Sequence, residues 1–318
     1  MARAKIPDCT AENFTDPISP IRFGDMARRL DLHPWDHLPD TAASGRRWAL
    51  VQGDCLETLE RLPPHSVDLV FADPPYMLSN GGTTCQSGRR ASVNKGTWDA
   101  SRGIETDHGF QKRWLQAARR VLAPSGTIWV SGTQHVIFSI GFAMQELGFH
   151  LLNTVTWYKP NASPNLACRF FTHSTEILLW ASPTREKPLA HRFNYRAMKA
   201  ANGGKQMRDL WQIAERPAPG GEQVVWSVPT PGPREKVHGK HPTQKPLALL
   251  ERVVAASAAP GDLVVDPFSG SATTGVAALR AGCRFLGMER DPAFVDLASR
   301  RLQAAELLPD AEGARAGR

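Results

Sequence analysis

Short apolar runs alternate with stretches of helical periodicity along most of the chain. The apolar runs predict strands at residues 48–52, 67–72, 127–131, 151–157, 263–266 and 285–289. Helical spacing of apolar residues predicts helices at residues 55–62, 110–122, 136–147, 247–259 and 273–281. This alternation is typical of an α/β fold with a doubly wound, mostly parallel sheet and helices on both faces.

The alternation stops between about residues 160 and 240, where Pro, Gly and charged residues accumulate. Residues 181–240 hold eleven Lys and Arg against five Asp and Glu, which is most of the net charge of +7. A structureless stretch of this length is uncommon inside a compact domain. We therefore interpret it as an inserted functional module, although a solvated basic loop would have the same charge.

Bulk properties exclude several classes of protein. No apolar run approaches the length of a membrane span, and the first residues lack the apolar core of a signal peptide, so we expect a soluble, cytoplasmic protein. The five cysteines have no C-x-x-C spacing, and no histidine has ligand spacing, so no metal site is expected.

One chemical signal is a turn of small residues, Asp266-Pro-Phe-Ser-Gly-Ser-Ala-Thr-Thr-Gly275, between a predicted strand and a helix. Small residues let backbone N–H groups approach a ligand, and a helix N-terminus favours an anionic group. The next strand ends in Glu289, about twenty residues downstream, where a carboxylate suits the hydroxyls of a ribose. The pair indicates an adenosine-containing cofactor, and a nicotinamide cofactor fits it too.

The second signal, Asp73-Pro-Pro-Tyr76, follows the predicted strand at 67–72. Two prolines remove two N–H donors, so carbonyls and the Asp73 carboxylate are presented as acceptors. Acceptors are what an exocyclic amino group requires, and Tyr76 offers a flat face for an unstacked base. A Pro-rich turn with a surface carboxylate is the structural alternative.

With both motifs in this order, the sequence resembles the β-class amino-group DNA methyltransferases and is most similar to the DpnA-type adenine methylases. Four blocks carry the resemblance, namely residues 73–82, 94–99, 164–176 and 239–246. It implies direct methyl transfer from S-adenosylmethionine to N6 of an adenine flipped out of DNA, in a GATC-like target. It also implies DNA as partner and leaves a homodimer and a cognate restriction endonuclease open.

Carried over by position, the resemblance gives roles to individual residues. The catalytic residues are Asp73, Pro74, Pro75 and Tyr76. The cofactor-binding residues are Asp54, Asp73, His241, Thr243, Gln244, Lys245, Asp266, Phe268, Gly270, Thr273 and Glu289. Together with the basic charge of the insertion, it assigns DNA contacts to Lys95, Arg169, His173, Arg192, Arg196, Lys199, Lys205 and Arg208.

The chain is accordingly divided into five parts. These are a peripheral or partly disordered arm (1–46), a catalytic half (47–159), a target-recognition insertion (160–240), a cofactor-binding half (241–308) and a flexible tail (309–318). The family's cofactor turn commonly reads Gly-Ser-Gly where this chain has Ala272. We expect an ordinary helical φ at Ala272, because a positive φ would cost about 1 kcal/mol.

Other functions remain as alternatives. N4 methylation of cytosine uses the same acceptors, but Ser is common there in place of Asp73. Methylation of RNA or of a protein glutamine leaves the insertion unexplained. An NAD-dependent oxidoreductase would use the small-residue turn but not Asp73-Pro-Pro-Tyr76, and an idle DNA-binding protein would not need these motifs intact. Cytosine-C5 chemistry requires a Pro-Cys nucleophile, which the chain lacks.

Overall fold

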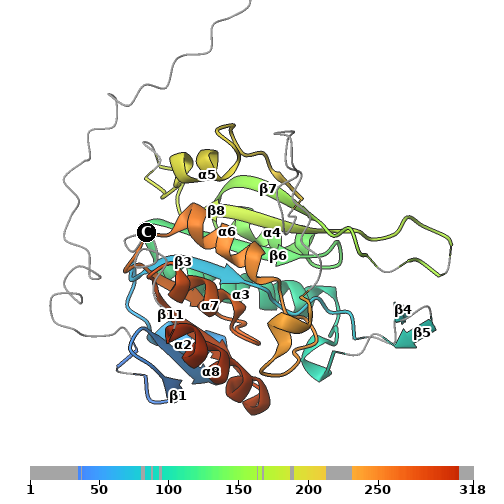
Figure 1. The fold of residues 1–318 in the computed structure, drawn as a ribbon, viewed down its shortest axis with the longest axis horizontal. Coiled ribbons are helices and arrows are strands. Elements are labelled where there is room, and N and C mark those ends of the chain that lie inside the picture. Colours follow the sequence, from blue (N-terminus) through green and yellow to red (C-terminus); the bar gives the residue numbers. More distant parts are fainter. Residues whose placement is uncertain are drawn as a thin grey trace, which may run out of the picture.

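The computed structural model describes residues 35–36, 38–79, 83–86, 89–92, 95–162, 164–166, 168–186, 190–212 and 231–307. Within these residues, nine strands form one sheet in the order β1-β2-β11-β10-β3-β6-β8-β7-β9 (Figure 1). The strands are β1 (Thr41–Ser44), β2 (Trp48–Gln52), β3 (Val67–Ala72), β6 (Leu122–Gly132), β7 (His150–Tyr158), β8 (Thr175–Ser182), β9 (Leu210–Gln212), β10 (Leu263–Asp266) and β11 (Arg284–Glu289). The five strands from β2 to β6 are mutually parallel, whereas β1 and β8 are antiparallel to their neighbours.

Helices cover both faces of this sheet. They are α2 (Cys55–Arg61), α3 (Ile104–Val121), α4 (Ile137–Glu146), α5 (Tyr195–Ala201), α6 (Leu247–Ser257), α7 (Thr273–Arg280) and α8 (Pro292–Glu306). Because side chains alternate along a strand, β3 contributes Val70 and Ala72 to the core beneath α2, α3 and α4, and Leu69 and Phe71 to the core beneath α6 and α7. A strand buried on both faces is mostly apolar, and β3 is apolar except for the partly buried Asp68 near its start. The predicted α/β fold with a mostly parallel sheet is confirmed.

Several elements are additional to the predicted ones. The predicted insertion contains β8, which pairs with β6 and β7 inside the main sheet, so the alternation continues through residues 175–182. The part of the predicted arm that is described packs against the core, with Trp35 and Leu38 buried and β1 paired to β2. Residues 1–34 and 308–318 lie outside the described residues. Among the described helices, none has the length and apolar character required to cross a membrane.

The strand order determines where ligands bind. Strands β10 and β3 are adjacent and parallel, but the chain passes from each to a strand on the opposite side, so a crevice opens between their carboxyl ends. Strand β8 runs the other way and therefore begins at this edge, which we call the active-site edge. Residues from the ends of β11, β10, β3 and β6 and from the start of β8 lie in one row along it.

Candidate active site

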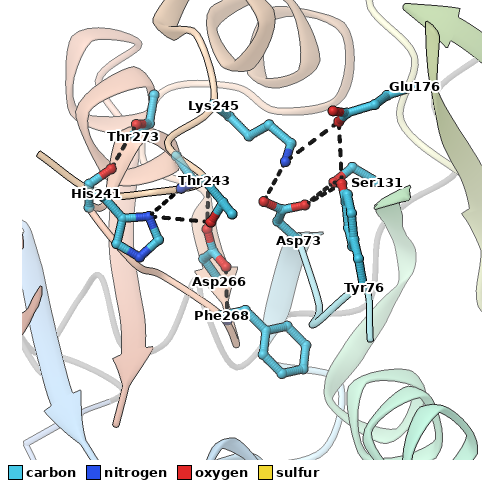
Figure 2. Close-up of polar contacts among 12 residues, drawn as sticks. Asp73, Tyr76, Ser131, Glu176, His241, Thr243, Lys245, Asp266, Phe268 and Thr273 are labelled. Atoms are coloured by element: carbon cyan, nitrogen blue, oxygen red, sulfur yellow. Dashed lines mark hydrogen bonds and ion pairs between the residues drawn. The ribbon is translucent and has the colours of Figure 1, made fainter. Parts of the chain in front are cut away.

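Asp73, the first residue after β3, lies at the centre of a polar network on the active-site edge (Figure 2). Its Oδ1 accepts hydrogen bonds from Tyr76 Oη at 2.7 Å and from Ser131 Oγ at 2.5 Å. Its Oδ2 pairs with Lys245 Nζ at 2.5 Å. An ionised carboxylate has about four acceptor sites. Three of them are occupied by described residues, and one on Oδ2 is left for a ligand.

Three residues that had no predicted role, Glu176, Lys159 and Ser131, complete the network. Glu176, at the start of β8, pairs with Lys159 Nζ at 2.9 Å and lies 3.6 Å from Lys245 Nζ. Its buried carboxylate keeps a lowered pKa, because the charges of Lys245 and Lys159 outweigh the effect of burial, which acts in the opposite direction. The pKa of Lys245 is raised by the carboxylates of Asp73 and Glu176 in spite of its burial. Ser131, from the end of β6, also lies 3.1 Å from Tyr76 Oη.

Tyr76 contributes both a ring and a hydroxyl to the site. Burial raises the pKa of Tyr76 well above its ordinary value, and the charges of Asp73 and Glu176 raise it further, so the hydroxyl stays protonated and donates to Asp73. Lys245 Nζ lies over the Tyr76 ring, 5.1 Å from the ring centroid, in a cation–π contact. The predicted stacking role of Tyr76 stays a prediction, and the hydroxyl additionally fixes the orientation of Asp73.

The loop that carries Tyr76 is held by one buried carboxylate, Asp99, which is 1% exposed. Its Oδ1 accepts from the backbone N–H groups of Tyr76 at 2.8 Å and Met77 at 2.9 Å. Its Oδ2 accepts from the N–H of Leu78 at 3.1 Å and from Ser79 Oγ at 3.0 Å. Met77 has φ 58°, a left-handed conformation that side chains rarely adopt. Asp99 therefore compensates a strained backbone directly behind the catalytic motif.

A cavity of about 790 Å³ extends from Asp73 along the ends of β10 and β11. This volume suits a nucleoside-sized molecule. Its lining includes all eleven predicted cofactor residues, namely Asp54, Asp73, His241, Thr243, Gln244, Lys245, Asp266, Phe268, Gly270, Thr273 and Glu289. Two buried side-chain atoms of lining residues, Ser269 Oγ and Gln244 Oε1, make no hydrogen bond with the described residues.

Glu289 closes one end of this cavity. Its Oε2 accepts from the backbone N–H of Gly270 at 2.9 Å, and its Oε1 accepts from the N–H groups of Arg290 and Asp291 at 2.8 and 2.9 Å. These bonds orient the carboxylate and leave one acceptor site, on Oε2. Burial raises the pKa of Glu289 in spite of these bonds. Oε2 is thus presented as an acceptor for a hydroxyl group of a ligand.

Asp266 organises the small-residue turn from the end of β10. It accepts from the N–H of Phe268 at 3.0 Å and from Thr274 Oγ1 at 2.6 Å. Burial raises the pKa of Asp266 to about 7, above its ordinary value of 3.8. A cationic ligand in the cavity would favour the ionised form.

His241 faces this turn from the other side. Burial, together with the charges of Lys245 and Arg301, lowers the pKa of His241 to about 4, so the ring is neutral near pH 7. Its Nδ1 accepts from the backbone N–H of Thr243 at 3.3 Å, which leaves the ring proton on Nε2. Gly270 has φ 50°, and a Cβ there would lie 3.0 Å from the His241 ring. Only glycine maintains this approach without displacing the ring.

The expectation for Ala272 is wrong. Ala272 has φ 54° and ψ 37°, a left-handed conformation at the residue that precedes α7. The conformation persists because Ala272 is fully buried and its N–H donates to Ser269 O at 2.7 Å. On the far side of the turn, the buried guanidinium of Arg301 in α8 donates to Ser271 O and to Thr273 Oγ1. The surrounding contacts therefore hold the turn in a conformation that alanine disfavours.

With this geometry established, the comparisons with known proteins identify the family. The family model for N6 and N4 methyltransferases, described as DNA methylase, matches residues 67–300. The chain belongs to this DNA methylase family. The chain is 46% identical to the Type II methyltransferase M2.DpnII of Streptococcus pneumoniae over 80% of this chain and 89% of the relative. It is 40% identical to M2.MboI of Moraxella bovis over 83% of this chain and 90% of that relative.

Solved structures of DNA methyltransferases share the fold. The PvuII DNA methyltransferase, described as cytosine-N4-specific, superimposes with a TM-score of 0.61 at 21% identity, over 86% of this chain and 90% of that protein. A complex of M1.HpyAVI with S-adenosylmethionine gives a TM-score of 0.53 at 24% identity, over 80% of this chain and 98% of that protein. The prediction of an S-adenosylmethionine-dependent DNA methyltransferase is confirmed.

The residues predicted to contact DNA lie in two places. Lys95 lies near the catalytic loop, where its N–H donates to Ser79 Oγ at 2.8 Å, and Arg169 and His173 are exposed on the connection from β7 to β8. Arg192 instead pairs with the buried Asp262 at 3.2 Å, and its N–H donates to Ser125 O, near the start of β6. Arg192 is thus at the sheet edge opposite the cavity, where it has a structural role.

The other four predicted DNA contacts are exposed. Arg196 and Lys199 lie on α5, and Lys205 and Arg208 lie between α5 and β9. No role was predicted from the sequence for Ser131, Lys159, Glu176, Asp99 and Arg301. Of these, Glu176 had a visible signal, since it directly precedes the apolar run of β8.

Proposed function

We propose that this chain transfers a methyl group from S-adenosylmethionine to N6 of adenine in DNA, acting directly on a flipped base. The observation that carries the proposal is the remaining acceptor site of Asp73 Oδ2, at the junction between the cofactor cavity and Tyr76. An N–H of the target amine would donate to this oxygen, and the Pro74 carbonyl would accept the second N–H. Both bonds favour a tetrahedral, nucleophilic nitrogen.

Residues of the cavity would hold the cofactor in parts. Glu289 would accept from a ribose hydroxyl at the remaining site of Oε2, and Asp54 would face the adenine ring. Asp266 would lie beside the cationic methionine portion. Phe268 would supply an apolar wall, since its ring packs edge-on against Trp114 at 5.3 Å. The bound cofactor supplies a methyl group that its sulfonium centre already activates.

The protein then has two tasks, to align the amine and to polarise it. During transfer the amine nitrogen would gain the methyl carbon, the sulfur would keep the electrons of the S–C bond, and the nitrogen would release one proton. Because burial and neighbouring charges keep the Tyr76 hydroxyl protonated, Tyr76 would not take up this proton. Asp73, as the acceptor for the amine N–H, would be the group along which the proton leaves for solvent.

Adenine is favoured over cytosine by the carboxylate itself. Cytosine-N4 enzymes commonly carry Ser at this position, whereas this chain has Asp73, which is bonded on both oxygens, by Lys245 on one and by Ser131 and Tyr76 on the other.

A second proposal concerns partners. Since the relatives are Type II methyltransferases, we propose a GATC-like target and a cognate endonuclease that cuts the same site.

The experiment that tests the function is to express the chain in cells that lack adenine methylation and to map modified bases in their DNA. The expected result is N6-methyladenine at one short sequence, absent when Asp73→Asn is expressed at the same level. N4-methylcytosine in place of N6-methyladenine would refute the assignment of the base. No modified base, with the wild-type protein soluble and able to bind S-adenosylmethionine, would refute the activity.

A further inference from the structure

The connection between β7 and β8 carries an apolar side chain far into solvent. Phe171 is 95% exposed, whereas its neighbour Phe170 is 58% exposed. In Figure 1 this yellow-green segment projects from the active-site edge, on the same side of the molecule as β4 (Thr83–Gln86) and β5 (Arg89–Ser92). The segment begins at Lys159 and ends before Glu176, both of which belong to the polar network around Asp73.

Internal contacts organise the segment around Phe171. The Asn165 Nδ2 group donates to Phe170 O at 2.7 Å, and the Phe170 ring packs on His173 at 5.3 Å. Within the described part of the chain, no ring contact of Phe171 is found. The neighbours of Phe171 are therefore fixed while its own ring is presented to solvent, although burying such a ring is worth about 1.5–3 kcal/mol.

We propose that Phe171 enters the base stack of bound DNA at the position that the flipped adenine leaves. The proposal rests on the proposed function. Glu176 is five positions after Phe171, so their Cα atoms are at most about 18 Å apart. Glu176 Oε2 is 3.3 Å from Tyr76 Oη, beside the pocket for the extruded base. The exposed ring is thus tethered within reach of both the target pocket and the duplex outside it.

The chemistry of the segment favours DNA as the occupant. A flat apolar ring replaces the lost stacking of a base, and such stacking contributes about 1–3 kcal/mol. This offsets part of the cost of unstacking the target, which is a few kcal/mol. The exposed side chains of Arg169 and His173, on either side of Phe171, supply donors for phosphate oxygens.

The test compares Phe171→Ala with wild type on two duplexes that carry the mapped target site. In one duplex the target adenine is paired, and in the other it faces an abasic site, so that it is already unpaired. We expect kcat/KM of the variant to fall about tenfold or more on the paired duplex and less than threefold on the abasic duplex. Phe171→Trp should keep activity on both, because indole also stacks.

A matched control is Leu307→Ala. Leu307 is 86% exposed at the end of α8, where Glu306 bonds to Trp48 at the start of β2, away from the cavity. Leu307→Ala should leave kcat/KM unchanged on both duplexes. A fluorescent 2-aminopurine in place of the target adenine reports base flipping without methyl transfer. Its emission in the complex with Phe171→Ala should be lower than in the complex with wild type.

If Phe171→Ala lowered kcat/KM by the same factor on both duplexes, the proposal would be overturned, because Phe171 would then be an ordinary DNA contact. Unchanged activity and unchanged 2-aminopurine emission would overturn it as well. If wild type methylated neither duplex, the proposed function would fail, while the emission measurement would still decide the role of Phe171.

Discussion

The buried carboxylate of Asp99 gives the sharpest test of how the catalytic loop is held. Asp99→Asn preserves shape but replaces one acceptor oxygen by an NH2 group. If the amide oxygen keeps the bonds from Tyr76 and Met77, the NH2 group faces the N–H of Leu78, and two donors then oppose each other. Ser79 can rotate its hydroxyl to accept, whereas the Leu78 N–H is left without an acceptor, at a cost of roughly 1–3 kcal/mol in the free energy of unfolding.

This change should also affect turnover, because Tyr76 is fixed through its own N–H. A displacement near 1 Å at a reacting centre lowers the rate by about 100-fold. We expect kcat to fall about 10- to 100-fold while the dissociation constant for S-adenosylmethionine changes less than threefold. Single-turnover methylation and isothermal titration measure the two quantities, and thermal unfolding measures stability.

Asp262→Asn is the matched control for Asp99→Asn. Asp262 is also a buried carboxylate, 2% exposed, and accepts from the N–H of Ala259 at 2.8 Å, but it lies at the start of β10, opposite the cavity. The Asp262→Asn variant should be less stable than wild type and should keep the wild-type kcat. If Asp99→Asn kept wild-type kcat in spite of reduced stability, or if the two variants lost kcat equally, the positioning role of Asp99 would be refuted.

Further substitutions test the remaining parts of the site. Asp73→Asn should lower kcat at least about 100-fold while S-adenosylmethionine binds within a few-fold of wild type, as measured by titration. Glu289→Ala should weaken cofactor binding by roughly 1.5–3 kcal/mol. Ala272→Gly should change it much less, because relief of about 1 kcal/mol of backbone strain is nearly cancelled by the loss of a buried methyl group; a reversal of this ranking in the titration would contradict the ribose assignment. Since the folded-state pKa of Asp266 is about 7, above its ordinary 3.8, the stability it contributes is present at low pH and lost as the pH rises through 7. Asp266→Asn should therefore unfold at a higher temperature than wild type at pH 8 and should lose this advantage at pH 4.

Most of the fold follows from local patterns in the sequence. The strands at 67–72 and 263–266 agree with β3 and β10, because strands buried on both faces are short, mostly apolar runs between turn residues. Strand β8 was not predicted, since its position in the middle of the sheet depends on pairing with β6 and β7, which are distant in sequence. The same holds for β1, whose short and half-exposed residues have no clear pattern of their own.

The active site likewise contains some residues that local sequence motifs reveal and others that only the tertiary structure brings together. The cofactor turn and Asp73-Pro-Pro-Tyr76 are contiguous motifs, so the sequence reveals them. Glu176 joins Asp73 only because β8 is antiparallel and begins at the active-site edge, and Arg301 joins the turn only because α8 packs behind it. The conformation of Ala272 was misjudged because local preference disfavours a positive φ, whereas tertiary contacts impose it.

The charge balance around Asp73 leads to a last prediction, for Lys245. Two carboxylates, Asp73 and Glu176, are buried beside one another and have Lys245 between them, at 2.5 and 3.6 Å. Replacing Lys245 by Met keeps the length of the side chain but removes the shared cation. Lys245 is the strongest of the charges that lower the pKa of Glu176, so its removal should raise that pKa, while Lys159 still pairs with Glu176 at 2.9 Å. A protonated Glu176 can donate to Tyr76 Oη instead of accepting from it, which disturbs the hydroxyl that orients Asp73. Lys245→Met should therefore lose activity on the acidic side and regain it as the pH rises, so we expect the acidic limb of its kcat profile to lie at higher pH than in wild type. If the profiles of wild type and Lys245→Met coincide in shape and differ only in height, Lys245 does not act by keeping Glu176 ionised.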